Sequence, residues 1–293
     1  MTSALLAGLC VVDLVHRVAR PPGPDEKVTA LSRELVAGGP ATNAAVTFAV
    51  LGGSARLLTA VGSGPWGDVV RADLERQALT LLDVAADDPA FELNVSSVLV
   101  AAATGERSVV SMDGGPIDEP AALTVTRAAL AEAAPDIVLL DGHHPVLATE
   151  AGRWARARRI PVVLDAGRWK PHFDDLLPLV DELVCSGDFA VPAGSGFGGV
   201  AAYGHRHGAR VVAQSHGPDA IELSVEGRHV RVPVPSVPAV DTLGAGDVLH
   251  GAYAYHRANG CDAEEALGRA AEVAAFRCRF VGSRAWVGAW AAQ

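Results

Sequence analysis

Residues 241–247 combine small residues with two aspartates in a pattern that could hold a phosphoryl group. They read Asp-Thr-Leu-Gly-Ala-Gly-Asp, and an apolar helical pattern follows at once. A turn of small residues entering a helix exposes backbone N–H groups, and the helix dipole adds positive potential there. Such a turn favours an anion, most often a phosphate. We interpret Gly244, Ala245 and Gly246 as the cradle for that group.

Asp247 is anomalous in this cradle because a carboxylate repels phosphate unless it has a proton to accept or a metal to hold. We interpret it as a general base aimed at a hydroxyl. Because a helix N-terminus favours the ionised carboxylate, we expect its pKa to be lowered. The alternative is an ordinary aspartate in the first turn of a helix, where the dipole also favours it. These residues alone do not decide between the two.

Two further aspartates lie at the ends of expected strands. Asp13 follows the apolar run Ala4–Val12, which we expect to be one strand buried on both faces. Asp141 follows the expected strand Ile137–Leu140. Open α/β sheets bind ligands at the carboxyl ends of their strands, so both side chains are candidate substrate contacts. For Asp141, a solvated loop remains an equal alternative.

A competing pattern occupies residues 62–67, which read Gly-Ser-Gly-Pro-Trp-Gly between an expected strand and an expected helix. A G-x-G-x-x-G loop in that position could bind a nicotinamide dinucleotide. However, Pro65 removes a backbone donor from the loop. A nicotinamide-dependent oxidoreductase is therefore a less favoured alternative.

Strand-like and helix-like segments alternate along most of the chain, as in a doubly wound α/β fold with a mostly parallel sheet flanked by helices. After the first strand, we expect strands at Ala55–Val61, Ile137–Leu140, Ile160–Leu164, Glu182–Val184, Arg210–Ala213, Ile221–Val225 and His229–Val232. We expect helices at Ala41–Leu51, Asp68–Leu79, Ala121–Ala133, Leu147–Ala157, Phe197–His207, Asp247–Ala258 and Ala263–Phe280.

Two β-like segments, about 14–37 and 91–114, interrupt this alternation. The second contains an expected hairpin formed by Leu93–Ala102 and Arg107–Met112. We expect these segments to form a small β-sheet lid on a single domain that spans residues 1–293. The apolar alternation at Val95–Val100 would leave an uncovered sheet, so we also expect a homodimer formed through the lids.

The composition of the chain limits the kinds of molecule that it is expected to bind. The chain has 24 Lys and Arg against 34 Asp and Glu, a net charge of −10, and no basic run interleaved with aromatic residues. This argues against nucleic acid as a partner. No apolar run is long enough to cross a membrane. The four cysteines form no CxxC pair, which suggests reduced thiols and a cytoplasmic location.

Two motifs resemble the signatures of the ribokinase-like, or PfkB-type, carbohydrate kinases. The first, residues 38–45, reads Gly-Gly-Pro-Ala-Thr-Asn-Ala-Ala and is followed by a strand and a glycine loop; the second is residues 241–247. The order of strands and lid segments also agrees, so the resemblance covers essentially the whole chain. It implies ATP-dependent phosphorylation of a sugar or polyol, with Mg²⁺, and leaves open a monovalent cation such as K⁺.

The resemblance also implies roles for individual residues. Asp247 matches the catalytic base, and Gly244, Ala245 and Gly246 match the anion hole. Substrate hydroxyls would be bound by the residues that match the family's sugar positions, namely Asp13, Gly39 and Asn43. The nucleotide side would include Thr242, Ser186, Gly217 and Gly282.

This sequence departs from the family pattern at the expected metal loop. A strand in the family commonly ends in N-x-x-E, whose glutamate helps organise magnesium, whereas residues 186–189 read Ser-Gly-Asp-Phe. Asp188 is the candidate replacement for the metal-organising carboxylate. Pro40 replaces a lysine that is frequent in ribokinase proper, and the pattern is more similar to ketohexokinase-like and sulfosugar-kinase-like branches.

The favoured function is phosphorylation of a primary hydroxyl of a small ketose or pentose derivative. One alternative is a nucleoside kinase of the same fold, which would need an aromatic base pocket, although aromatic residues make up only 5% of the chain. Another is a catalytically weak sugar-binding or regulatory protein, suggested by the altered metal loop.

Overall fold

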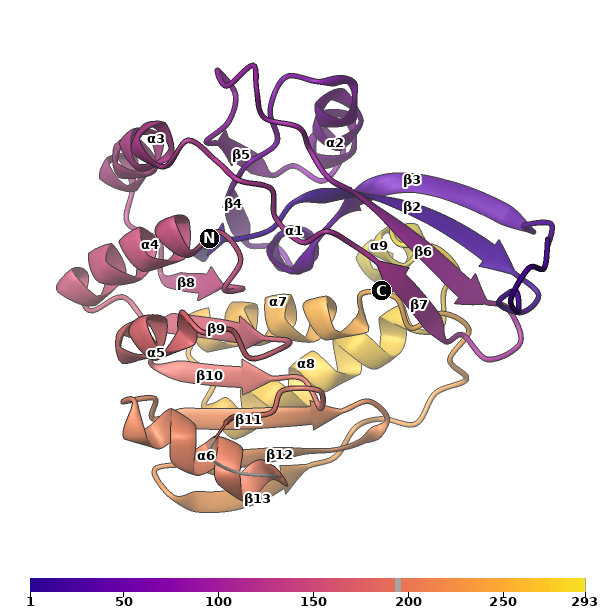
Figure 1. Ribbon diagram of the computed structural model, residues 1–293. Helices are drawn as coiled ribbons and strands as arrows, with labels where there is room; N and C mark the ends of the chain where they lie inside the picture. The colour runs from indigo at the N-terminus through magenta and orange to yellow at the C-terminus, as the bar shows by residue number, and fades with distance from the viewer. Residues whose placement is uncertain (193–195, 293) are drawn as a thin grey trace.

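The computed structural model describes residues 1–192 and 196–292, and its frame is a large β-sheet with a smaller sheet beside it (Figure 1). From edge to edge the large sheet consists of β13 (Arg228–Val232), β12 (Asp219–Val225), β11 (Val211–His216), β10 (Glu182–Cys185), β9 (Val162–Ala166), β8 (Ile137–Leu140), β1 (Ser3–Ala7), β4 (Ser54–Thr59) and β5 (Thr80–Asp83). Its strands run parallel except for β12 and β13, which add an antiparallel hairpin at one edge.

Helices cover both faces of this sheet. One face packs against α1 (Pro40–Val50), α2 (Pro65–Glu75), α7 (Ala245–Ala258), α8 (Ala263–Arg277) and α9 (Ala285–Ala291). The other packs against α3 (Glu119–Glu132), α4 (Pro145–Arg158), α5 (Phe173–Leu176) with the adjoining 3₁₀ turn Leu177–Leu179, and α6 (Gly196–Arg206). Within β1, Ala4 and Leu6 enter the first core while Leu5 and Ala7 enter the second. Burial on both faces explains why these strands are continuous apolar runs.

The small sheet, here called the lid, consists of β3 (Ser32–Gly38), β2 (Val11–Val18), β6 (Val95–Ala101) and β7 (Arg107–Val110), in that order. Its inner face buries Val15, Val98 and Val100 against Leu243 of the 241–247 turn. At the tip of the β6–β7 hairpin, the Gly105 carbonyl accepts hydrogen bonds from the backbone N–H and the hydroxyl of Thr242 (3.1 and 2.9 Å). The lid therefore docks directly on the turn.

The expectation of one strand over Ala4–Val12 is wrong. Strand β1 ends at Ala7, the chain bends through residues 8–10, and β2 begins in the lid. Gly8 leaves room there for the Asp141 carboxylate, since a Cβ would lie 2.0 Å from it, and this carboxylate accepts the Leu9 N–H (2.8 Å). Asp13 is consequently the third residue of a lid strand and does not lie at the end of the first strand.

Helix α8 is shorter than expected. It ends at Arg277 instead of Phe280. The carbonyl of Phe280 instead accepts a hydrogen bond from the Arg277 guanidinium at 3.1 Å, so the chain turns back on the helix end. The remaining expected helices and strands are present at their predicted places, with boundaries shifted by a few residues.

Two of the apolar lid residues that suggested pairing between two subunits are not on an uncovered face of the lid. Val98 and Val100 are buried inside this chain, while the outer face exposes Leu35 (40%) and Val110 (74%). A homodimer through the lid stays a prediction. In the part of the chain that the structure describes, no helix is long and apolar enough to cross a membrane.

Candidate active site

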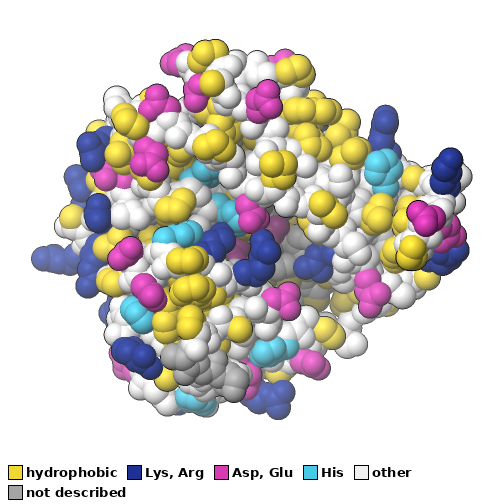
Figure 2. Space-filling model, in the orientation of Figure 1, with side chains coloured by type: hydrophobic (Ala, Val, Ile, Leu, Met, Phe, Trp, Pro, Cys, Tyr) yellow, Lys and Arg dark blue, Asp and Glu magenta, His cyan; other side chains and the backbone are white. Residues whose placement is uncertain are grey.

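A cavity of about 590 Å³ lies between the lid and the carboxyl edge of the large sheet. Figure 2 shows this face hollowed, with acidic and basic side chains gathered in and around the hollow. Its walls include eight of the residues predicted for catalysis, substrate binding or the metal: Asp13, Gly39, Asn43, Asp141, Asp188, Gly244, Gly246 and Asp247. The fold thus brings the two motifs, about 200 residues apart, to one place.

Asp247 is held by a chain of polar contacts that begins at Arg284, the N-cap residue of α9. The Asn43 amide donates to Asp247 Oδ2 at 2.7 Å, and Arg284 donates to Asn43 Oδ1 at 2.9 Å. Arg284 also donates to the Ala37 carbonyl (2.6 Å) and lies 3.4 Å from Asp73 Oδ2. Because a guanidinium can only donate, it fixes the amide with its NH₂ group toward Asp247.

The pKa of Asp247 is raised, so the prediction of a lowered value is wrong. Burial is the largest cause, and it outweighs the lowering by Asn43, His250 and Arg107. Burial disfavours the charged form of a carboxylate, which accounts for the direction of the shift. A raised pKa makes this carboxylate a stronger base once it is ionised.

Asp13 faces the same cavity from β2 and is 9% exposed. Gly38 leaves room for it, since a Cβ there would lie 2.1 Å from the carboxylate. Burial, followed by the charge of Asp247, raises the pKa of Asp13 to about 7, while Arg284 acts in the opposite direction. Two carboxyl groups that affect each other in one cavity wall titrate as a pair.

The 241–247 turn has the geometry expected for an anion site. Gly244 adopts a left-handed conformation (φ 72°) as the N-cap of α7, which favours glycine. The Ala245 N–H is taken by the Thr242 carbonyl (3.3 Å). Within residues 1–192 and 196–292, the backbone N–H groups of Gly244, Gly246 and Asp247 have no acceptor, so they remain available to a ligand.

Gly39 and Asp141 organise the floor of the cavity. Asp141 accepts backbone N–H groups from Leu9 (2.8 Å), Ala41 (3.0 Å) and His143 (2.8 Å). Gly39 (φ 102°) packs so closely that a Cβ would lie 2.4 Å from the Leu9 carbonyl oxygen. These bonds give Asp141 a structural role that the sequence did not predict; its substrate contact stays a prediction.

Basic residues around the cavity were missed by sequence reasoning. Arg107 lines it from β7, while Arg168 and Lys170 line it from the loop after β9. Among the described residues, Arg107 and Lys170 have no carboxylate within ion-pair distance, and Arg168 lies 3.3 Å from Asp113. The one available signal was that Lys170 lies in the loop after an expected strand, six residues beyond Leu164.

His250 and Asp165 form a buried polar pair beneath the turn. The His250 Nδ1 atom lies 2.7 Å from the Gly246 carbonyl oxygen and 3.3 Å from Asp165 Oδ2, while Nε2 lies 3.2 Å from the Val184 carbonyl oxygen. Burial raises the pKa of Asp165 to about 7, against the lowering effect of His250. The ring connects α7 to β9 and β10 below the 241–247 turn.

The residues predicted for the nucleotide side are not all brought together. Ser186 lines the cavity and donates to the Gly167 carbonyl (2.7 Å). Thr242 contacts Gly105 of the lid, and Gly282 donates its N–H to Asp241 Oδ2 (3.0 Å). Gly217 (φ 62°) lies in the β11–β12 turn, where a Cβ would meet no atom within 4 Å. Their roles in nucleotide binding stay predictions.

Asp188, the candidate magnesium ligand, is exposed at the rim of the cavity. No group of three or more His, Cys, Asp or Glu side chains suited to a metal ion occurs among the described residues. Magnesium is commonly held by one or two carboxylates together with substrate phosphates, so a single carboxylate near a phosphate site fits such an ion.

The glycine loop at residues 62–67 is occupied by the chain itself. Asp83 accepts the N–H groups of Val61 (2.8 Å) and Gly62 (3.1 Å) and pairs with Arg71 at 2.7 Å. A carboxylate thus takes the backbone donors that a pyrophosphate would need. The geometry does not favour a dinucleotide at this loop.

Comparison with known families agrees with the geometry of the site. The sequence profile described as "pfkB family carbohydrate kinase" matches residues 1–287. The chain belongs to the PfkB family of carbohydrate kinases. This assignment excludes the oxidoreductase alternative and makes the protein a sugar kinase by family.

Relatives of this PfkB-family chain are similar over nearly their whole length. A ribokinase of Bacillus subtilis (strain 168) is 25% identical over 282 residues, covering 91% of this chain and 89% of that protein. An ATP-dependent ribose-1-phosphate kinase of Halopiger xanaduensis is 29% identical over 273 residues, with coverage of 91% and 88%. The phosphofructokinase-2 of Escherichia coli in complex with potassium has the same fold, with a TM-score of 0.77, 17% identity and coverage of 99% and 98%.

Proposed function

We propose that this chain transfers the γ-phosphoryl group of ATP to a primary hydroxyl of a small sugar, with Asp247 as the general base. The observation that carries the proposal is the 2.7 Å hydrogen bond from Asn43 to Asp247, beside three backbone N–H groups that have no acceptor among the described residues. Asp247 Oδ1 accepts no hydrogen bond from a described residue, so it is available to the attacking hydroxyl.

The acceptor sugar would lie against Asp13, Asn43 and the backbone of Gly39, which offer a carboxylate, an amide and a close backbone approach. Asp247 would take the hydroxyl proton as the oxygen bonds to phosphorus. The phosphoryl oxygens would accept from the N–H groups of Gly244, Gly246 and Asp247, which are fixed before the reaction.

Arg107 and Lys170 supply positive charge to the same space. Charge spreads over the transferred phosphoryl group in the transition state, so cations near it lower the barrier. Burial lowers the pKa of Lys170, and the charges of the surrounding aspartates oppose this shift without cancelling it. Since neither side chain pairs with a described carboxylate within 4.0 Å, a phosphate would provide their partner.

Magnesium fits at the rim, where Asp188 would hold it together with the ATP phosphates and water. When bound, the ion would neutralise phosphate charge and orient the donor. ATP use is supported by the ATP-dependent relative, and sugar specificity by the ribokinase and ribose-1-phosphate kinase relatives. The ketose or pentose class remains our proposal.

A sugar is favoured over a nucleoside because none of the described residues that line the cavity is Phe, Tyr or Trp. A nucleoside base is favoured by an aromatic surface to stack on. The four cysteines Cys10, Cys185, Cys261 and Cys278 are free thiols, which supports our proposal of a cytoplasmic location.

The deciding experiment measures ADP release across a panel of ketoses, pentoses, their monophosphates and nucleosides, with and without Mg²⁺. We expect Mg²⁺-dependent turnover on one sugar class. Turnover on nucleosides alone would replace the proposal. Sugar binding by calorimetry, with no ADP release from any member of the panel, would support the sugar-binding alternative.

A further inference from the structure

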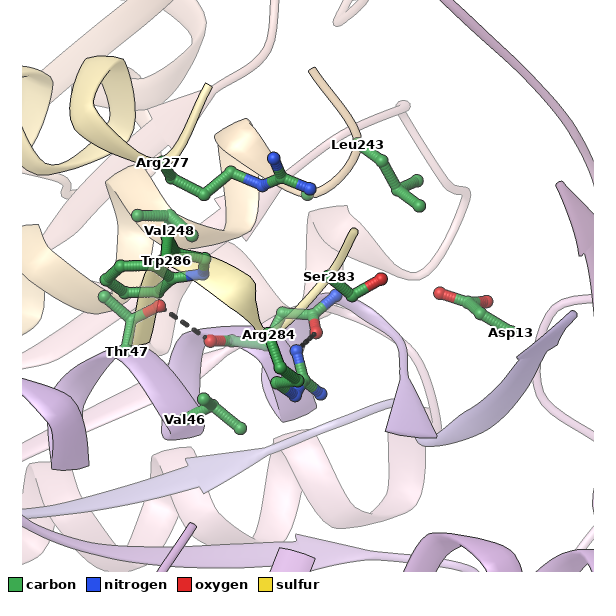
Figure 3. A pocket seen from close by; sticks show the side chains of 11 residues that line it. Asp13, Val46, Thr47, Leu243, Val248, Arg277, Ser283, Arg284 and Trp286 are labelled. Carbon is green, nitrogen blue, oxygen red and sulfur yellow. Dashed lines mark hydrogen bonds between the residues drawn. The ribbon is translucent and has the colours of Figure 1, made fainter. Parts of the chain in front are cut away.

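Arg277, the last residue of α8, is a buried arginine behind the turn of residues 241–247, here called the anion turn. Its side chain is 1% exposed. The guanidinium donates to the backbone carbonyls of Asp241 (3.0 Å), Phe280 (3.1 Å) and Gly282 (3.4 Å). Its Nη2 atom also lies 3.5 Å from Asp241 Oδ1. Figure 3 shows this side chain extending toward the segment that carries Leu243.

Three carbonyl oxygens and one carboxylate oxygen surround the guanidinium, two at Nη1 and two at Nη2, and oxygens of these kinds coordinate cations. Here the cation that they surround is a guanidinium, which carries its charge permanently and is tethered to a helix. A metal ion could use these oxygens only if Arg277 left them.

The contacts of Arg277 determine where the anion turn lies. Asp241 begins the turn, and its carboxylate also accepts the N–H groups of Leu243 (3.0 Å) and Gly282 (3.0 Å). The Val240 N–H donates to the Cys278 carbonyl (2.8 Å). The segment that leads into Gly244 is therefore hydrogen-bonded to residues 277–282 through its backbone and through the Asp241 carboxylate. The Arg277 guanidinium adds a further bond to the Asp241 carbonyl.

We propose that Arg277 is a built-in cation that positions the anion turn, so that this kinase needs no K⁺ or other monovalent metal ion. The monovalent cation left open by the sequence does not fit the oxygens behind the turn because Arg277 occupies them. The related fold of Escherichia coli phosphofructokinase-2 is found in complex with potassium, so the two proteins would differ in binding this ion. This inference rests on the proposed function.

The first test compares the kcat of the wild type in tetramethylammonium, sodium and potassium chloride at equal ionic strength, with MgATP and the accepted sugar. We expect values within twofold of one another. A rise in kcat of tenfold or more that is specific to K⁺ would overturn the proposal.

The second test removes the guanidinium of Arg277 by substitution. We expect R277A to lose at least a hundredfold in kcat and to regain at least tenfold with added guanidinium or K⁺, because the vacated oxygens accept a free cation. The matched control is R279A, whose exposed side chain lies over the face of Phe276, 5.4 Å from the ring centre, and makes no hydrogen bond or ion pair with a described residue. It should keep wild-type kcat. A folded R277A with wild-type activity, or one that responds to neither ion, would contradict the proposal.

A third measurement does not depend on activity or on the folding of a variant. We expect the thermal midpoint of the wild type to be the same within 1 °C in K⁺ and tetramethylammonium, and Rb⁺-soaked crystals to show no anomalous peak beside Asp241. A K⁺-specific rise of several degrees, or such a peak, would overturn the inference. If the sugar panel shows no turnover, this measurement still decides the cation question while the proposed function fails separately.

Discussion

The two sides of the cavity differ in how completely their polar groups are bonded before any ligand arrives. The acceptor side is defined by Asp13, Asn43, Asp247 and Arg284. Hydrogen bonds link the half-buried side chains of Arg284, Asn43 and Asp247 in series, and the buried carboxylate of Asp13 lies in the same cavity wall. On the donor side, defined by Ser186, Asp188 and Gly217, Asp188 is exposed and Gly217 has open space around it.

This difference indicates which polar groups of the site are preorganised before a ligand binds. Preorganised dipoles lower a reaction barrier because they need not reorient as charge develops. The acceptor side has such an arrangement, whereas we infer that the donor side takes its geometry from MgATP. Substitutions on the acceptor side should therefore change the chemical step, and substitutions on the donor side should change chiefly the Mg²⁺ requirement.

The largest effect is expected for D247N. The amide cannot accept the hydroxyl proton, so kcat should fall by about 10²–10⁴-fold. Sugar and ATP affinity, measured by calorimetry, should change little. Turnover near the wild-type value would remove Asp247 from the role of base and weaken the contrast between the two sides.

A smaller but clear loss of kcat is expected for R284M, because Arg284 acts on Asp247 through Asn43. The variant frees the amide to rotate and leaves Asp73 without its buried partner, so we expect kcat to fall about 10–100-fold and the free energy of unfolding to fall by about 3 kcal/mol. Stopped-flow turnover and urea denaturation measure the two effects.

The control for R284M is R76A. Arg76 also contacts Asp73, at 3.1 Å, but its side chain is 66% exposed. Removal of this side chain should lower the free energy of unfolding by less than about 1 kcal/mol and leave kcat unchanged. Equal losses of kcat in both variants would mean that Asp73 stabilises the fold without positioning the base.

The pH dependence should report the paired carboxyls of the acceptor side. With the pKa of Asp13 raised to about 7 and that of Asp247 also raised, kcat/KM should be about tenfold lower at pH 6 than at pH 8. Since folded Asp13 binds its proton more tightly than unfolded Asp13, its contribution to stability falls as the pH rises from about 4 to 7.

The variant D13N removes one member of this pair. Its unfolding free energy should decline less between pH 4 and pH 7 than that of the wild type, and its KM for the sugar should rise. A stability profile parallel to that of the wild type would show that burial of Asp13 does not perturb its titration.

The smallest effect is expected for D188N on the donor side. An exposed carboxylate that shares a metal ion with phosphates is partly replaceable by water, so we expect kcat at saturating Mg²⁺ to stay within about threefold. The Mg²⁺ concentration for half-maximal rate should rise several-fold. A hundredfold loss of kcat at saturating Mg²⁺ would show that the donor side is as preorganised as the acceptor side.

The sequence by itself determined the family, the order of the elements and the two motifs. Residues 38–45 and 241–247 are recognisable because each is a local turn entering a helix, where glycine and the helix N-terminus impose their own requirements. The buried strands were also predictable, since residues of β1 enter both cores and must be apolar on both faces.

Only the tertiary structure decided how Asp247 is held and charged. Arg284 meets Asn43 across 241 residues of chain, and Arg277 meets Asp241 across 36, and no local pattern in the sequence records either partner. The same holds for the end of β1, where the Asp141 carboxylate takes the Leu9 N–H. The sign of the Asp247 pKa shift followed from burial, which depends on the lid and helices that surround a side chain and so cannot be read from its neighbours in sequence.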